Sequence, residues 1–175
     1  FETRNDVSEE EYIKMIYLKT SVLLAGSLRH GALLADAPEH EYNALYEFGG
    51  YLGLAFQLQD DYLDVYGDVA EFGKNIGGDI VANKKTYMLI KALELADPET
   101  KEELWGWIER KEFDHEEKIK AVTRIYDRLG IKEVVFAAID KYLKMSREIL
   151  DKIDVPEERK IDFYETLDAI GNRKK

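Results

Sequence analysis

The segment Phe56–Asp64, which reads Phe-Gln-Leu-Gln-Asp-Asp-Tyr-Leu-Asp, gathers three carboxylates at helical spacing. On a helix, Asp60 and Asp64 are four residues apart and Asp61 and Asp64 are three apart, so all three lie on one side. Gln57 precedes Asp60 by three residues and joins that face. No Lys or Arg lies within one turn, and like charges at this spacing destabilise a helix. Oxygen ligands without nitrogen or sulfur suit Mg²⁺ or Mn²⁺, which also hold substrate phosphates.

Two further clusters could contact the same phosphates. The glycine-rich segment from Gly73-Lys74 to Asp79-Ile80, followed by Asn83-Lys84, offers backbone N–H groups and point charges, although a flexible charged loop would have the same composition. Lys19-Thr20 could hold an anion, or Lys19 could extend its ammonium from an apolar face into water. Because 36 of the 175 residues are Asp or Glu, the aspartate pattern alone also arises by chance.

Composition excludes several classes of protein. The net charge of −11 argues against a nucleic-acid or anionic-membrane binder, because both need a basic surface. The absence of cysteine excludes a disulfide scaffold and thiol chemistry and suits a cytoplasmic location. No apolar run approaches the roughly 20 residues that span a bilayer.

The elements that position these residues are expected to be helices throughout, because helical spacing dominates and strand-like alternation is almost absent. Ser8 and Glu11 form a predicted capping box that opens a helix, with a bend near Gly26-Ser27. After a break at Pro38, a long helix is predicted from Glu39 to about Tyr66.

Glycines at 49, 50 and 53 interrupt this long helix, and either close approach of another helix or a ligand, or a kink, would explain them. Gly67–Val81 is predicted to be a loop, and Asn83 to cap a helix that ends at Leu95. The remaining predicted helices begin at Asp97-Pro98 and run over 115–129, 131–153 and 157–170.

Taken together and in this order, the three clusters resemble the C-terminal half of the trans-isoprenyl diphosphate synthases, the farnesyl and geranylgeranyl diphosphate synthase family. Tyr17-Leu18-Lys19-Thr20 is similar to the family's Lys-Thr helix. Phe56–Asp64 is similar to its second aspartate-rich motif, and Gly73–Lys84 to the lysine loop that follows. The resemblance implies an isoprenoid-synthase-type helical bundle and an Mg²⁺-dependent prenyltransferase that condenses an allylic diphosphate with isopentenyl diphosphate.

The resemblance also implies a role for each matching residue. Asp60 would be the principal metal ligand, with Asp61 and Asp64 coordinating or holding metal-bound water. Asp60, Asp61 and Lys19 would form the catalytic set. The allylic diphosphate would be bound by Lys19, Thr20, Lys74 and Lys84, while Phe56 and Gln57 would lie beside the carbocation or the isopentenyl group. Arg173 or Lys174 of the basic tail would reach isopentenyl diphosphate.

The family's first aspartate-rich motif and its Gly-Lys-x-x-Arg segment have no counterpart in this chain. Together with Phe1 as the first residue, this leads us to expect that residues 1–175 are the C-terminal part of a single all-helical domain. Its partners would be the N-terminal half of the same synthase and a second copy in a homodimer, and the isolated chain would be inactive. The alternatives are a non-catalytic partner subunit, a prenyl-diphosphate-binding protein of the same fold, a terpene cyclase, or a helical bundle with chance motifs.

Overall fold

The computed structural model describes residues 4, 6–67 and 76–172, and this part of the chain contains helices and no strand, as predicted. Its residues form two compact units. Unit 1 comprises Phe1–Tyr12 and Asp60–Phe136, and unit 2 comprises Ile13–Gln59 and Ala137–Lys175.

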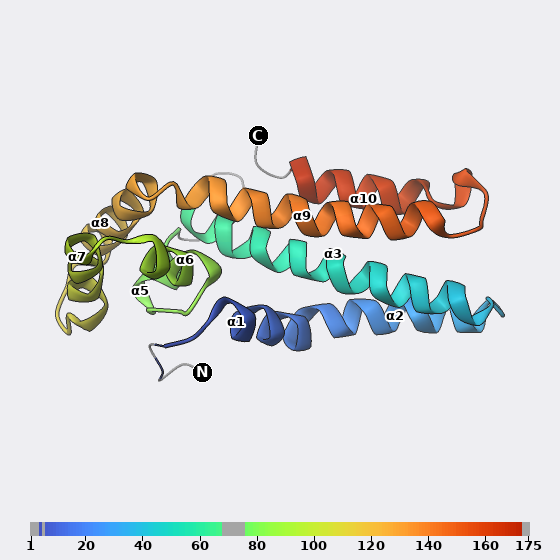
Figure 1. Ribbon diagram of the computed structural model, residues 1–175, viewed down its shortest axis with the longest axis horizontal. Coiled ribbons are helices and arrows are strands. Elements are labelled where there is room, and N and C mark those ends of the chain that lie inside the picture. The colour runs from blue at the N-terminus through green and yellow to red at the C-terminus, as the bar shows by residue number, and fades with distance from the viewer. Residues whose placement is uncertain (1–3, 5, 68–75, 173–175) are drawn as a thin grey trace. The chain divides into compact units, whose positions relative to one another are not determined.

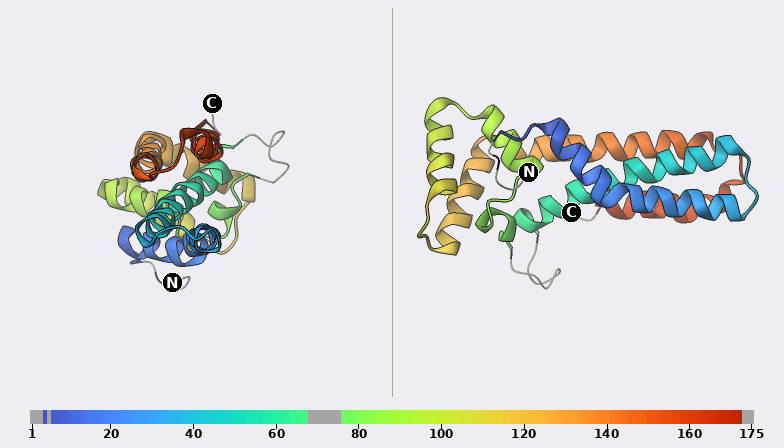
Figure 2. Two further views of the ribbon diagram at one scale, coloured as in Figure 1. Left: turned by 90° about the vertical axis from the view of Figure 1, so that its right-hand side faces the viewer. Right: turned by 90° about the horizontal axis from the view of Figure 1, so that it is seen from below.

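The described residues of unit 2 include four long helical segments. They come from α2 (Val22–Leu34), α3 (Glu39–Tyr66), α9 (Ile131–Lys152) and α10 (Ile161–Asn172), the last preceded by the short 3₁₀ helix η2 (Glu157–Arg159). Figure 1 and Figure 2 show α2 beside the first part of α3, and α9 beside α10. The centre of the unit is a cluster of buried side chains, namely Phe48, Leu52, Leu150, Ile153, Leu167 and Ile170. The predicted helix over 39–66 is confirmed, and the one predicted over 157–170 begins with a 3₁₀ turn.

The glycines of α3 allow the close approach of the preceding helical segment. A Cβ added to Gly53 would lie 2.6 Å from Ser21 Cα, and one added to Gly49 would lie 2.8 Å from Ala25 Cα. Real Cβ atoms essentially never come so close, so only glycine permits this packing. Close approach of another helix, one of the explanations left open by the sequence, therefore accounts for both residues.

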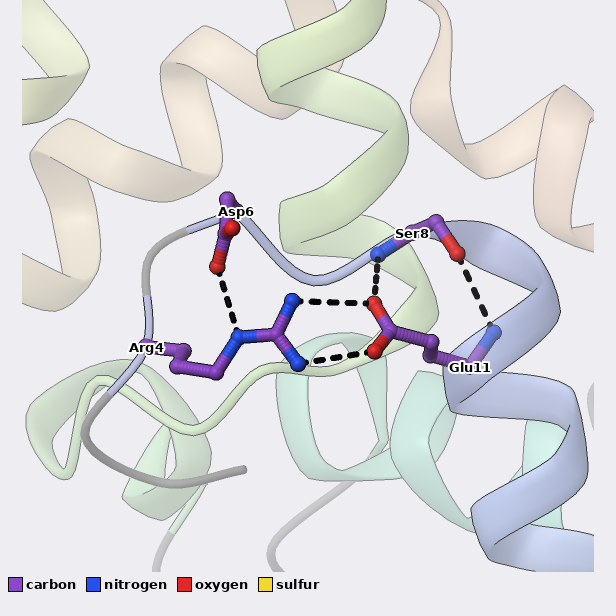
Figure 3. A network of polar contacts seen from close by, with 4 residues as sticks. All are labelled: Arg4, Asp6, Ser8 and Glu11. Carbon is purple, nitrogen blue, oxygen red and sulfur yellow. Dashed lines mark hydrogen bonds and ion pairs between the residues drawn. The ribbon is translucent and has the colours of Figure 1, made fainter.

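The first helical segment begins at the predicted capping box, but its regular α-helical geometry ends at Ile16, before the predicted bend. The Ser8 hydroxyl accepts the Glu11 N–H at 3.2 Å and Glu11 accepts the Ser8 N–H at 3.1 Å, which closes the capping box at the start of α1 (Glu9–Ile16) (Figure 3). Arg4 reinforces this start by donating to Glu11 at 2.8 Å. The segment then widens into the π-helix η1 (Tyr17–Ser21). The helix continues beyond Gly26-Ser27 as predicted, since α2 runs through both residues, and the bend expected there stays a prediction.

The described residues of unit 1 include four shorter helices besides the parts of α1, α3 and α9 that belong to it. They are α5 (Gly78–Val81), α6 (Tyr87–Leu95), α7 (Pro98–Glu109) and α8 (His115–Arg128), of which the last two lie side by side in Figures 1 and 2. Asp97 caps α7 as predicted, accepting the Thr100 N–H at 2.8 Å. The prediction that Asn83 caps the next helix is wrong, because Thr86 caps α6 and Asn83 adopts a left-handed conformation with φ 51°. The predicted loop over 67–81 is wrong at its end, where α5 forms, and its residues 68–75 lie outside the described part of the chain.

Candidate functional site

The end of α3 within unit 1 places Asp61 among donors. Asp61 is 2% exposed and accepts a hydrogen bond from the hydroxyl of Tyr12, a residue of α1 that is 1% exposed. Burial, followed by the charge of Asp61, raises the pKa of Tyr12, so the phenol remains a donor. The Lys84 ammonium lies 3.8 Å from the other carboxylate oxygen of Asp61. These contacts satisfy a carboxylate that would otherwise be costly to bury.

Hydrogen bonds made by Asp79 connect Lys84 to Asp64 of α3. Lys84 Nζ donates to Asp79 Oδ2 at 2.8 Å, and the Asp79 N–H donates to Asp64 Oδ2 at 2.8 Å. Burial lowers the pKa of Lys84, but the hydrogen bond with Asp79 and the nearby carboxylates outweigh this effect and raise it, so the side chain is a cation at neutral pH. Burial raises the pKa of Asp64. The result is a fixed ammonium beside the aspartate motif.

Asp60 differs from its neighbours because its side chain is exposed. No hydrogen bond or ion pair to another described residue engages its carboxylate, whereas both Asp61 and Asp64 accept hydrogen bonds. Within the described residues, no group of three His, Cys, Asp or Glu side chains is arranged to enclose a metal ion. This donor set fits Mg²⁺ held by one or two carboxylates together with water and phosphate oxygens, and it does not fit a closed protein cage.

Unit 2 presents the remaining described residues of the predicted site. Thr20 Oγ1 donates to Gln57 Oε1 at 2.9 Å, which joins η1 to α3. Lys19 is exposed beside Thr20, and Phe56 is 39% exposed. Both Lys19 and Thr20 lie on the π-helical turn, a feature that often occurs at functional sites.

Comparison with known proteins decides which family this arrangement represents. The family model for polyprenyl synthetase matches residues 1–126. The chain belongs to the polyprenyl synthetase family. Among the described residues of this polyprenyl synthetase chain, no helix has the length and apolar content needed to cross a bilayer.

Individual relatives agree with the family. A short chain isoprenyl diphosphate synthase from Methanothermobacter thermautotrophicus is 37% identical over 159 residues, which cover 91% of this chain and 48% of the relative. A crystal structure of geranylgeranyl pyrophosphate synthase is 37% identical with a TM-score of 0.92, and the match covers 100% of this chain and 54% of that one. A geranylgeranyl pyrophosphate synthase from Corynebacterium glutamicum, crystallised with isoprenyl diphosphate and magnesium, is 29% identical with a TM-score of 0.84 over 94% of this chain and 47% of its own. The chain therefore spans about half the length of the relatives it matches.

The structure of this polyprenyl synthetase chain brings some of the predicted site residues together. Asp61, Asp64 and Lys84 are linked through Asp79 in unit 1, and Thr20 is bonded to Gln57 in unit 2. Lys74, Arg173 and Lys174 lie outside the described residues, so their predicted roles stay predictions.

The sequence pattern predicts neither Tyr12 as a site residue nor Asp79 as a partner of Lys84. Tyr12 belongs to the apolar stripe of the first helix, and a tyrosine on a buried face needs a partner for its hydroxyl. This need for a hydroxyl partner is the signal in the sequence that could have pointed to Tyr12. The partner itself is 49 residues away in sequence, so spacing could not reveal it.

Proposed function

We propose that this chain carries the C-terminal half of a trans-prenyltransferase that condenses an allylic diphosphate with isopentenyl diphosphate to give a longer polyprenyl diphosphate. The observation that carries the proposal is that unit 1 contains both an exposed Asp60, which has a carboxylate available for a metal ion, and a Lys84 ammonium held by Asp61 and Asp79. A diphosphate needs both a metal ion and fixed cations around it. The names of the relatives, isoprenyl and geranylgeranyl diphosphate synthases, support the same reaction.

Each residue has a task in this reaction that follows from its chemistry. Asp60 would hold Mg²⁺ or Mn²⁺, which supplies positive charge to the leaving pyrophosphate, and Asp64 would hold metal-bound water. Lys84 would donate to diphosphate oxygens and keep its position through Asp61, so Asp61 would orient this ammonium in addition to binding the metal ion. The other residues proposed to bind diphosphate are Lys19, Thr20, Lys74 and, for isopentenyl diphosphate, Arg173. Phe56 and Gln57 would lie beside the carbocation or the isopentenyl group.

The proposal includes the assembly around the chain. Magnesium dependence, a homodimer, a cytoplasmic location and pairing with an N-terminal half that carries the first aspartate-rich motif rest on the family resemblance. The isolated chain would bind pyrophosphate with Mg²⁺ but would not condense substrates, because the second half of the metal and isopentenyl diphosphate sites would be absent. Formation of a longer prenyl diphosphate by the pure chain would contradict this part of the proposal.

Calorimetric titration of the chain with inorganic pyrophosphate in the presence of Mg²⁺ tests the binding step. Lys84→Met should weaken binding by about tenfold or more, because a charge-assisted hydrogen bond to phosphate is lost. Asp60→Asn should weaken the Mg²⁺-dependent part of binding. Lys120→Met is the matched control, since Lys120 is an exposed lysine of the same unit that pairs with Glu116. Equal binding by all four proteins, or no binding by the unaltered chain, would contradict a diphosphate site at the end of α3.

A further inference from the structure

Unit 1 buries one lysine that the proposed reaction does not use. Lys118 of α8 is 1% exposed, and no described carboxylate forms an ion pair with it. Its ammonium donates to Asn83 Oδ1 at 2.7 Å and lies 4.2 Å from the centroid of the Phe113 ring. Burial, followed by the charge of Lys85, lowers the pKa of Lys118. Burying an ammonium without a carboxylate partner costs free energy, so we expect Lys118 to have a specific role that offsets this cost.

Asn83 has an unusual backbone conformation that its side chain holds in place. Its φ of 51° lies in the left-handed region, which asparagine tolerates better than most residues. The Asn83 Nδ2 group donates to the Ile108 carbonyl at 2.9 Å, while Oδ1 accepts from Lys118. The two bonds tie the turn to the end of α7 and the start of α8.

Lys84 follows this turn directly, so the backbone of Asn83 sets its direction. The Lys84 N–H donates to the Asp79 carbonyl at 3.0 Å, and the Thr86 N–H donates to the Lys84 carbonyl at 2.8 Å. The Lys84 ammonium then reaches Asp79 Oδ2 at 2.8 Å. A change in the left-handed residue would rotate both the backbone bonds and the ammonium away from these partners.

We propose that Lys118 is a positioning residue that fixes the Asn83 turn and thereby aims the Lys84 ammonium at the aspartate face of α3. This proposal rests on the proposed function in so far as Lys84 binds diphosphate. It assigns a task to a residue of α8 that lies outside the three motif clusters. It also explains why Asn83 does not cap α6, since its side chain is committed to Ile108 and Lys118.

Amide hydrogen exchange of the full chain tests the positioning role without any ligand. In Lys118→Met, the Lys84 and Thr86 amides should exchange about tenfold faster or more, because a hydrogen bond from a charged donor is lost. The amides in the middle of α8 should keep their exchange rates. Lys120→Met, a substitution on the same helix, should leave the exchange rates of the Lys84 and Thr86 amides unchanged. Equal acceleration throughout unit 1 would indicate only a structural role and would overturn the proposal, as would unchanged rates at Lys84 and Thr86.

Two substitutions at Asn83 keep the proposal testable if Lys118→Met fails to fold. Asn83→Gly allows the left-handed conformation but removes both side-chain bonds, so it should accelerate the same two amides. Asn83→Asp keeps an acceptor for Lys118 and should accelerate them less. If Asn83→Asp accelerates them as much as Asn83→Gly does, the bond to Lys118 does not hold the turn, and the proposal is overturned.

Pyrophosphate titration with Mg²⁺ then separates this proposal from the proposed function. If Lys118 acts through Lys84, Lys118→Met should weaken pyrophosphate binding when it is the only substitution. It should have no further effect when it is added to a chain that already carries Lys84→Met. An additional loss in the double variant would overturn the proposal. If the unaltered chain does not bind pyrophosphate, the proposed function fails, while the exchange rates still decide whether Lys118 positions Lys84.

Discussion

Replacement of Gly53 by alanine should destabilise unit 2, although alanine is the better helix former. The added Cβ would lie 2.6 Å from Ser21 Cα and 2.7 Å from Ser21 Oγ, and Ser21 is fully buried. The nearest atom belongs to the backbone of η1, so no side chain can rotate to make room. Overpacking of this kind costs up to about 3 kcal/mol. The gain in helix propensity offsets about 1 kcal/mol of that. The net loss in free energy of unfolding should therefore be about 2 kcal/mol.

Urea unfolding followed by far-ultraviolet circular dichroism measures this loss. Gly26→Ala is the matched control, since Gly26 also lies in a helix of unit 2 but a Cβ there would meet nothing within 4 Å. The control should gain up to about 1 kcal/mol, so the two variants should differ by about 3 kcal/mol. Fluorescence of Trp105 and Trp107, both in unit 1, reports separately on the other unit.

A Gly53→Ala protein as stable as Gly26→Ala would refute the close-approach argument. Ser21 is the last residue of η1, which also carries Thr20. The variant should therefore also weaken the bond from Thr20 to Gln57. Faster exchange of amides around Thr20 than in the control would show this effect, and unchanged rates would indicate that the turn moves as a rigid piece.

Two further substitutions concern the aspartate face in unit 1. Tyr12→Phe keeps the ring but removes the donor to the buried Asp61, and should lower the free energy of unfolding by about 2 kcal/mol in urea titrations; a loss below about 0.5 kcal/mol would contradict the importance of this bond. Burial raises the pKa of Asp64 above its usual 3.8, so the folded protein binds this proton more tightly than the unfolded chain. The protonated carboxyl group therefore stabilises the fold fully below about pH 4, and this stabilisation is lost as the pH rises through the folded pKa. Asp64→Asn should therefore be more stable than the unaltered protein at pH 7 and lose this advantage near pH 3.5; an equal difference at both values would contradict the shift.

The sequence alone predicts the helical class and several helix ends because these depend on local chemistry. Pro38 precedes α3, Asp97-Pro98 opens α7, and Gly130, with φ 66°, separates α8 from α9. Each of these signals acts within one turn of the residue concerned. The capping box of Ser8 and Glu11 is confirmed for the same reason.

The predictions that failed required knowledge of contacts distant in sequence. Asn83 has the side chain of a good helix cap, yet Ile108 and Lys118, 25 and 35 residues away, bind that side chain instead. The aspartate motif could be recognised from spacing, but not the difference between an exposed Asp60 and a buried Asp61. That difference depends on Tyr12, which the chain brings to α3 only when it folds.

The π-helical turn of η1 accommodates one residue more than an α-helical turn would within the first helical segment. Its defining bond runs from the Val22 N–H to the Tyr17 carbonyl, five residues back. The buried positions of this segment within unit 2 follow the same spacing, since Ile16 and Ser21 are five residues apart and Ser21 and Ala25 are four apart. An uninterrupted α-helix would turn Ser21 about 100° away from this stripe. The turn therefore absorbs one residue beyond the α-helical spacing, and a deletion of one residue there should leave an uninterrupted α-helix in which Ser21 and Ala25 still face Gly53 and Gly49.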